Sequence, residues 1–455
     1  MRKWVVLAVV VLAVAAIWPV VVGTQVEGTV AETHEAQLGE VYLRHEMLEY
    51  ERGYLAASGR SRLILEDADG RFEIPLVHAV RHGLLGARGD SFVDLDTLAA
   101  PDDSLLAHLL RSLDLQVHSR SGIGGGVTTR IAFDDLRMDL MSVPEVAEHA
   151  ATVGGPLWLD LAAGQGRFAW SSEQILVSLD LPETRLSDAS FSWEAREARY
   201  ATVFEADADG VFGRLPDYEG GLAAAVIELR EGEATRLHLE RPRLDAFQHT
   251  NNDRMDSRLR LQVDHARVDD GAGDALTLTA LDLQAAILRW DRPSMLQFLA
   301  ELEAVDARGI EGEQRNALIG SAMIDALGGM IEHQPAIQLR ASLNDEPPRQ
   351  VALDAELGLH GTQQSLTTRP LETLRLDSDL RLGLEWVAEF DAAYPDIDLD
   401  AQLHALAADG WVRRDAEAGY WHGTLAMADG RVRINDVDRT AMLLALLFAF
   451  SGGMF

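Results

Sequence analysis

The sequence predicts a mainly β protein, a β-rich α+β fold in which long, curved antiparallel sheets connect as meanders. Several segments alternate apolar and polar residues with a period of two, which is typical of strands that cover a core on one side. Asp-Gly pairs stand at points where such segments meet. The fold also includes one N-terminal transmembrane helix and one inserted helical pair.

The transmembrane helix is predicted from the apolar stretch between Trp4 and Val22, which Arg2 and Lys3 precede. At ~1.5 Å per residue, such a helix crosses most of a hydrocarbon core ~30 Å thick. Basic residues in front of it place the N-terminus in the cytoplasm, so residues beyond Gly23 are expected on the far side of the membrane. A cleaved signal peptide, cut after Ala15, is the alternative.

Strands are predicted where one face of the pattern is apolar and the other is charged. In the clearest segment, Leu259, Leu261 and Val263 alternate with arginine and other polar residues. The predicted strands with this pattern are Ser257–Val268, Val351–Leu359, Leu374–Leu384 and Ile397–Leu403.

Hairpin turns are predicted at four Ala-Asp-Gly sequences, because a type I′ turn needs a positive φ at both central residues. Their Asp-Gly pairs are Asp69-Gly70, Asp209-Gly210, Asp409-Gly410 and Asp429-Gly430. These turns indicate that neighbouring strands follow one another along the chain.

Helices are predicted where apolar residues recur every three or four positions. Leu296, Leu299 and Leu302 follow Pro293 at this spacing. The predicted helices are Pro293–Val305, Gln314–His333, Trp386–Ala393 and an apolar closing helix, Asp438–Phe450.

These elements divide the chain into five segments. They are residues 1–23 (cytoplasmic tip and signal anchor), 24–150 (N-terminal β-rich region), 151–290 (central antiparallel region), 291–334 (helical insertion) and 335–455 (C-terminal β region with the closing helix).

The composition excludes several classes of site and partner. The 455 residues include 73 acidic and 40 basic side chains, a net charge of −33, and no cysteine. Disulfides, thiolate metal sites and cysteine nucleophiles are therefore excluded, and a strongly negative surface repels nucleic acid. We expect no nucleic-acid partner.

Three patterns resemble ligand sites but lack a required part. Asp207 and Asp209 imitate the start of a calcium loop, but Pro216 stands where an EF-hand needs its bidentate Glu. His78 and His82 have zinc-like spacing, but they lie in a predicted strand and not on a helix that would bring both rings to one face. The glycines between residues 122 and 126 precede a β-branched run, whereas a phosphate loop precedes a helix. We predict no catalytic residue, cofactor or metal site.

A set of short motifs has the order found in one known family. The motif residues are Gly23, Glu27, Tyr50, Arg52, Gly53, His82, Gly83, Gly430 and Asn435. The chain resembles the YdgA-type family of bacterial envelope proteins, a domain of unknown function, over nearly its whole length. It departs from the family at Leu84, where proline often follows His-Gly. The resemblance implies an inner-membrane protein that faces the periplasm, and it supplies no reaction or substrate.

The motif residues are expected to have structural roles. Gly53 and Gly83 suit bends in strands, where a side chain would clash. Arg52 is expected to pair with a carboxylate on a neighbouring strand.

The leading functional hypothesis is a non-enzymatic binding or assembly protein of the cell envelope, with an envelope protein or a lipid as its partner. In one alternative, it handles lipid in an apolar groove of a sheet; in another, it is a periplasmic enzyme of unknown type. Whether helices seal the apolar sheet face separates a closed scaffold from a lipid groove, and we expect a closed scaffold.

Overall fold

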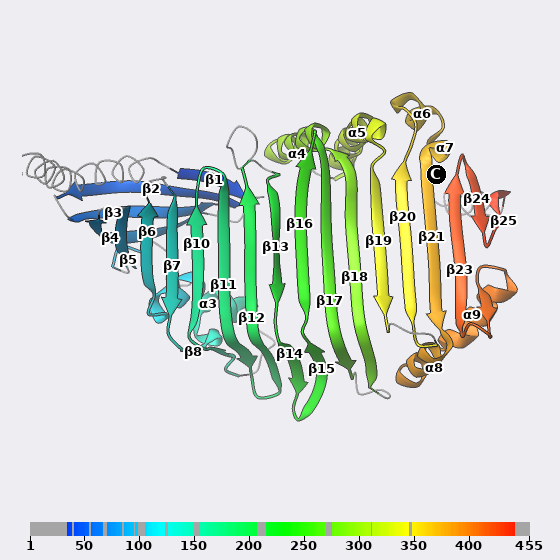
Figure 1. Ribbon diagram of the computed structural model, residues 1–455, viewed down its shortest axis with the longest axis horizontal. Coiled ribbons are helices and arrows are strands. Elements are labelled where there is room, and N and C mark those ends of the chain that lie inside the picture. Colours follow the sequence, from blue (N-terminus) through cyan, green and yellow to red (C-terminus); the bar gives the residue numbers. More distant parts are fainter. Residues whose placement is uncertain are drawn as a thin grey trace, which may run out of the picture. The chain divides into compact units, whose positions relative to one another are not determined.

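The computed structural model confirms a mainly β fold with long antiparallel strands and a few helices (Figure 1). It describes residues 34–38, 41–53, 56–66, 71–83, 86–94, 96–98, 105–122, 126–149, 155–206, 215–269, 275–310, 312–344 and 348–441. The predicted anchor Trp4–Val22, with Gly23 and Glu27, lies outside these residues. Within them, no helix has both the length and the apolar character needed to cross a membrane.

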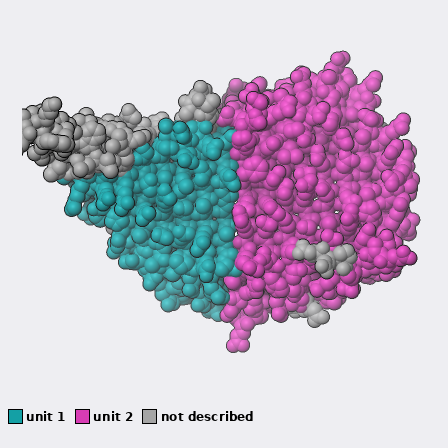
Figure 2. Space-filling model, in the orientation of Figure 1, with its two compact units in different colours: residues 1–225 teal, residues 226–455 magenta. Residues whose placement is uncertain are grey.

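The chain forms two compact units, residues 1–225 and residues 226–455 (Figure 2). In unit 1, seven strands pair antiparallel in chain order, each with the next. They are β1 (His34–Leu38), β2 (Val41–Arg52), β3 (Ala56–Glu66), β4 (Arg71–Gly83), β5 (Gly86–Val93), β6 (Gln116–Gly122) and β7 (Val127–Phe133).

The rest of unit 1 is organised around one long strand, β11 (Gln174–Ser187). One edge of β11 pairs with β12 (Phe191–Glu205), which continues to β13 (Asp217–Ala223). Its other edge is shared by β10 (Gly164–Trp170), which also pairs with β7, and β9 (Trp158–Leu161), which pairs with β8 (Leu136–Asp139). Short helices α2 (Leu105–Ser112), η1 (Leu140–Ser142) and α3 (Pro144–His149) connect the strands.

Unit 2 contains a second antiparallel series. Strand β17 (Arg254–Val268) pairs with β16 (Arg243–Asn251) and with β15 (Ala234–Glu240), which pairs with β14 (Val226–Glu231). Its other edge continues through β18 (Leu276–Asp291), β19 (Ala336–Leu343), β20 (Val351–Leu359), β21 (Leu374–Gly383) and β23 (Tyr420–Ala428). Strands β22 (Arg413–Asp415), β24 (Arg431–Ile434) and β25 (Val437–Asp438) complete the series.

The predicted helical pair is confirmed as α4 (Arg292–Ala307) and α5 (Gly312–Met330), which continues as η2 (Ile331–His333). The carboxylate of Asp291 starts α4, because it accepts a hydrogen bond from the backbone N–H of Ser294 at 2.9 Å. The third prediction is confirmed as α8 (Leu384–Ala393). Short helices α6 (Gln363–Thr368) and α7 (Pro370–Thr373) precede β21.

The prediction of a strand over Ile397–Leu403 is wrong, because this segment enters helix α9 (Leu399–Ala408). Two aspartates satisfy the N–H groups of its first turn. Asp391 accepts hydrogen bonds from Leu399 and Asp400 at 2.6 and 3.0 Å, and Asp398 accepts one from Ala401 at 3.3 Å. These caps stabilise a helix whose leucines also fit a strand pattern.

The four predicted hairpin turns have different outcomes. Asp429-Gly430 is confirmed, since both residues have positive φ (51° and 70°) and Ala428 pairs with Arg431. The prediction of a hairpin turn at Asp409-Gly410 is wrong, because this pair ends helix α9, where Gly410 has a φ of 80°. Asp69-Gly70 and Asp209-Gly210 lie outside the described residues, as does the predicted closing helix beyond Ala441; its first residue, Asp438, belongs to β25.

Candidate functional site

The apolar residues of unit 2 gather on one face of the sheet formed by β17 to β21. Residues directly opposite on neighbouring strands share a face, so the pairings define rows that run across the strands. In one row Leu259 lies opposite Ala285, which lies opposite Leu339. Three adjacent rows are apolar almost throughout. They are Ser257, Ile287, Ile337, Leu357 and Leu376; Leu259, Ala285, Leu339, Ala355 and Ser378; and Leu261, Leu283, Ala341, Leu353 and Leu380.

This apolar face is open to solvent in its centre. Five of its large side chains are 38 to 48% exposed: Leu259, Leu283, Ile337, Leu339 and Leu357. Single exposed leucines are normal on protein surfaces, but a contiguous group marks an interaction site. We call these three rows the open apolar face. The described helices thus do not seal this part of the sheet, and the expectation of a closed scaffold stays a prediction.

The helices of unit 2 leave the face open because they lie near the ends of the strands (Figure 1). At one end, α8 and α9 bury a compact cluster of Val387, Leu403, Val412 and Trp421 against the end of β21 and β23. Helices α4 and α5 lie at the other end. Within the part of the chain that the structure describes, no helix forms a second layer over the apolar side chains between these ends.

The opposite face of the same strands carries charged residues in ion pairs. Arg260 donates to Asp282 at 2.9 Å, and Arg340 donates to Asp354 at 3.2 Å. The hydrogen bonds from Arg260 hold the pKa of Asp282 below its ordinary value. These four residues line a concavity of about 620 Å³. Because each charge has an opposite partner, the concavity offers no uncompensated charge to a ligand.

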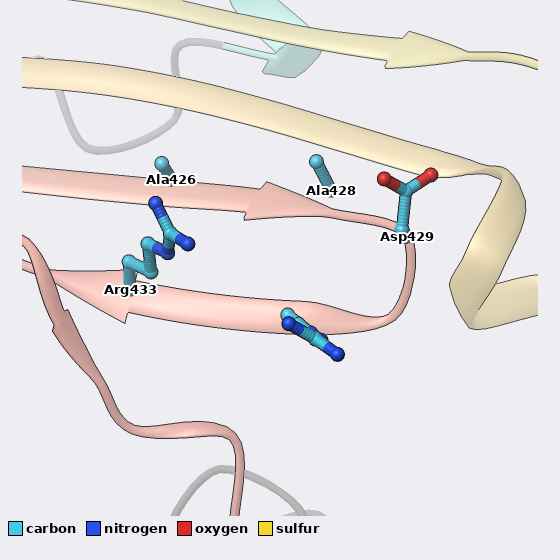
Figure 3. A pocket seen from close by; sticks show the side chains of 5 residues that line it. Ala426, Ala428, Asp429 and Arg433 are labelled. Carbon is cyan, nitrogen blue, oxygen red and sulfur yellow. The ribbon is translucent and has the colours of Figure 1, made fainter.

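A second concavity of about 490 Å³ lies along the β23–β24 hairpin (Figure 3). Its lining residues are Ala426, Ala428, Asp429, Arg431 and Arg433. It combines an alanine floor with one carboxylate and two guanidinium groups. This set contains no pair of a nucleophile and a base, so it does not suggest a reaction.

The motif residues near the N-terminus lie in strands or at their ends. Tyr50 and Arg52 belong to β2, and Gly53 ends it in a tight bend. The N–H of Gly53 donates to the carbonyl of Ala56 at 2.7 Å, and a Cβ on Gly53 would lie only 2.8 Å from that oxygen. Because the Ala56 oxygen lies so close, a residue with a Cβ would clash at position 53, which explains why this residue is a glycine.

His82 and Gly83 are the last residues of β4, at its hairpin with β5. His82 pairs with Ala87, and Gly83 pairs with Gly86. The structure thus places these two motif residues in a strand ladder of unit 1, whereas Gly430 and Asn435 belong to unit 2.

The side chain of Asn435 makes three hydrogen bonds to the backbone. Its side chain is buried and accepts a hydrogen bond from the N–H of Thr424 at 2.9 Å. It donates to the carbonyls of Gly410 and Trp411 at 2.9 and 3.1 Å. The side-chain amide of Asn435 therefore connects the end of α9 to β23. The positive φ of Asn435 (49°) orients the side chain towards both segments.

Asn344 repeats the same arrangement at the end of β19. It also has a positive φ (55°), and its side chain accepts from the N–H of Thr279 at 3.0 Å and donates to the carbonyl of Arg349 at 3.0 Å. Asn344 belongs to none of the sequence motifs. An asparagine directly after an alternating segment is the signal that could have found it.

His78 has a serine partner on each of its two ring nitrogens. Its Nε2 lies 2.6 Å from Ser61 Oγ, and its Nδ1 lies 2.7 Å from Ser91 Oγ. Ser61 is 1% exposed, so a substrate cannot reach this serine–histidine pair. Burial, with a smaller contribution from His45, lowers the pKa of His78 to about 4. Among the described residues, no three His, Asp or Glu side chains are arranged to hold a metal ion.

Comparison with known proteins identifies the family. Residues 1–438 match the model of a family described as bacterial proteins of unknown function (DUF945), and the chain belongs to this family. No curated protein matches the chain. The resemblance seen in the sequence is thus confirmed at the level of a bacterial family of unknown function, and the YdgA-type assignment stays a prediction.

The Asn435 network predicts a large loss of stability in an Asn435→Ala variant. The substitution leaves the N–H of Thr424 and two carbonyls without their partner, and each unsatisfied buried group costs roughly 1–3 kcal/mol. We expect the free energy of unfolding, measured with urea, to fall by at least about 2 kcal/mol. Asn252→Ala is the matched control, because Asn252 is exposed and has the same φ of 49°. Equal losses of unfolding free energy in both variants would contradict the prediction, because they would show that the hydrogen bonds of Asn435 do not contribute to stability.

The environment of His78 predicts a stability that depends on pH. Its pKa is about 4 in the folded protein and an ordinary 6.5 in the unfolded chain. As the pH falls from 6.5 towards 4, the unfolded chain binds a proton that the folded protein does not, so stability is lost. The loss from this group is on the order of 3 kcal/mol. The difference in unfolding free energy between the wild-type protein and His78→Gln should shrink accordingly between pH 7 and pH 4; a constant difference would contradict the prediction.

Proposed function

We propose that the protein is a non-enzymatic binding protein of the bacterial cell envelope that works through the open apolar face of unit 2. The observation that carries this proposal is the contiguous group of five leucine and isoleucine side chains that are 38 to 48% exposed. An apolar surface of this kind is costly in water, and it is stabilised when a partner covers it.

The location follows from the N-terminal sequence. Arg2 and Lys3 precede the apolar stretch Trp4–Val22, so we propose a single span in the inner membrane with the bulk of the chain in the periplasm. A tethered protein of this kind would hold its open apolar face close to a membrane.

The charged groups support a binding role over a catalytic one. The opposite sheet face pairs Arg260 with Asp282 and Arg340 with Asp354, so these carboxylates act as ion-pair partners. The pKa of Asp282 is lowered by its partner, which makes it a weaker base. A periplasmic enzyme would need convergent titratable groups next to a substrate site.

The lipid-handling alternative shares this site and differs only in what covers it. A closed scaffold would bury Leu259 and Leu339 against a second layer, whereas both are 48% exposed. The open face therefore favours a groove over a closed scaffold.

Topology can be measured with reporter fusions. We expect a reporter enzyme that is active only in the periplasm to be active when fused after Asp409, because the single predicted span lies at the N-terminus. A cytoplasmic reporter at the same position should be inactive. Activity of the cytoplasmic reporter would contradict the proposed location.

A pair of neighbouring substitutions tests the binding face. Leu283 and Gln284 lie on opposite faces of β18, so Leu283→Asp places a carboxylate on the open apolar face and Gln284→Asp places it between Arg260 and Arg340. We expect Leu283→Asp to abolish the binding of a fluorescent dye specific for exposed apolar surface, with little loss of stability, since Leu283 is 38% exposed.

Gln284→Asp should bind the dye as the wild-type protein does. A Leu283→Asp variant that unfolds would show instead that the side chain is buried in a closed core, because an unpaired buried carboxylate is strongly destabilising.

A further inference from the structure

We propose that the occupant of the open apolar face is a diacyl phospholipid whose two acyl chains lie side by side across the strands. This inference rests on the proposed function and specifies the chemistry of its ligand. It is carried by the number of apolar rows, their length, and the residue types that they expose.

The three rows, spaced as residues two apart in a strand, give the open apolar face a width of about 13 Å. Residues two positions apart in a strand point to the same face and lie about 6.6 Å apart, which sets the spacing of the rows. The middle row contains Leu259 and Leu339, both 48% exposed, more than the exposed leucines and isoleucines of the outer rows. These leucines stand along the middle of the face. Its width accommodates two acyl chains side by side, and a single-chain fatty acid would leave part of the face uncovered.

The length of the rows matches an acyl chain. Each of the three rows runs across the strands from β18 to β21. Three strand spacings of about 4.8 Å give a length of about 14 Å. One leaflet of a bilayer, half of a hydrocarbon core about 30 Å thick, has nearly the same extent.

The chemistry of the face favours hydrocarbon over a protein partner. Its exposed large side chains are leucine and isoleucine, whereas protein interfaces concentrate their binding energy in Trp, Tyr and Arg. Both edges of β18, β19 and β20 are already paired within the sheet, so a peptide cannot add to them as a strand. An extended peptide laid on the face would lose its hydrogen bonds to water and gain none in return.

The charge of the chain disfavours a second copy as the occupant. Two chains with a net charge of −33 repel each other, and a headgroup with no net charge is not repelled. We therefore expect phosphatidylcholine to bind more tightly than the anionic phosphatidylglycerol.

Photolabelling tests the proposal on the full-length protein. The purified protein is mixed with phosphatidylcholine vesicles in which one acyl chain carries a photoactivatable group, and labelled residues are mapped by mass spectrometry. We expect label in β17 to β20 on residues of the open apolar face, at least tenfold less label there in Leu339→Asp, and unchanged label in Gln284→Asp. Unlabelled phosphatidylcholine should compete at a concentration at least tenfold lower than its single-chain lysolipid.

The outcomes separate this inference from the proposed function. If the apolar dye binds and Leu283→Asp abolishes its binding, but no label reaches β17 to β20, the face is a binding site and the lipid proposal is overturned. Sedimentation of a dimer that Leu339→Asp dissociates would identify a second copy instead. Equal competition by the lysolipid would overturn the two-chain arrangement. If neither dye nor lipid reaches the face, both proposals fail.

Discussion

The structure depends on one constraint, the period-two alternation of long antiparallel strands. Each strand of unit 2 from β17 to β21 places leucine, isoleucine and valine on one side and charged residues on the other, and the strand pairings align these sides into two continuous faces. Most domains cover such an apolar face with a second layer. Here the helices lie near the strand ends, so the same alternation that builds the sheet also leaves an apolar surface in contact with water (Figure 1).

A sheet without a second layer over its centre must be stabilised by other interactions. In unit 2 these interactions lie at the strand ends. At one end, Trp421 is buried with Val387 and Leu403 between β23 and two helices. Asn435 and Asn344 then fasten the loops beside these ends, each through a side-chain amide that bonds both to a strand and to a second segment. Backbone ladders and these buried amides fix the register. The centre of the face can therefore stay open without loss of a defined structure.

Local patterns in the sequence predict most of the strands and helices, but they do not predict whether helices cover the apolar face of the sheet. The strand Val351–Leu359, the helical pair and the turn at Asp429-Gly430 were predicted from spacing and turn chemistry alone, because each depends on its own residues. Ile397–Leu403 was mistaken for a strand since its leucines fit both periods, and the deciding caps came from Asp391 and Asp398. Whether helices cover the apolar face is a property of the whole fold. No local pattern in the sequence contains that information.

An exposed apolar face would ordinarily promote association between copies of a chain, and the charge of this chain opposes that outcome. Each copy carries a net charge of −33, so the approach of two copies is repulsive at the distances where their apolar faces would meet. On the opposite sheet face, pairs such as Arg260 with Asp282 neutralise local charge, so the excess of negative charge resides elsewhere on the surface. Electrostatic repulsion of this kind acts on negatively charged partners and does not act on neutral hydrocarbon. The combination of an open apolar face with a strongly acidic chain is therefore consistent with the proposal that the face binds an uncharged apolar ligand and not a second copy of the protein.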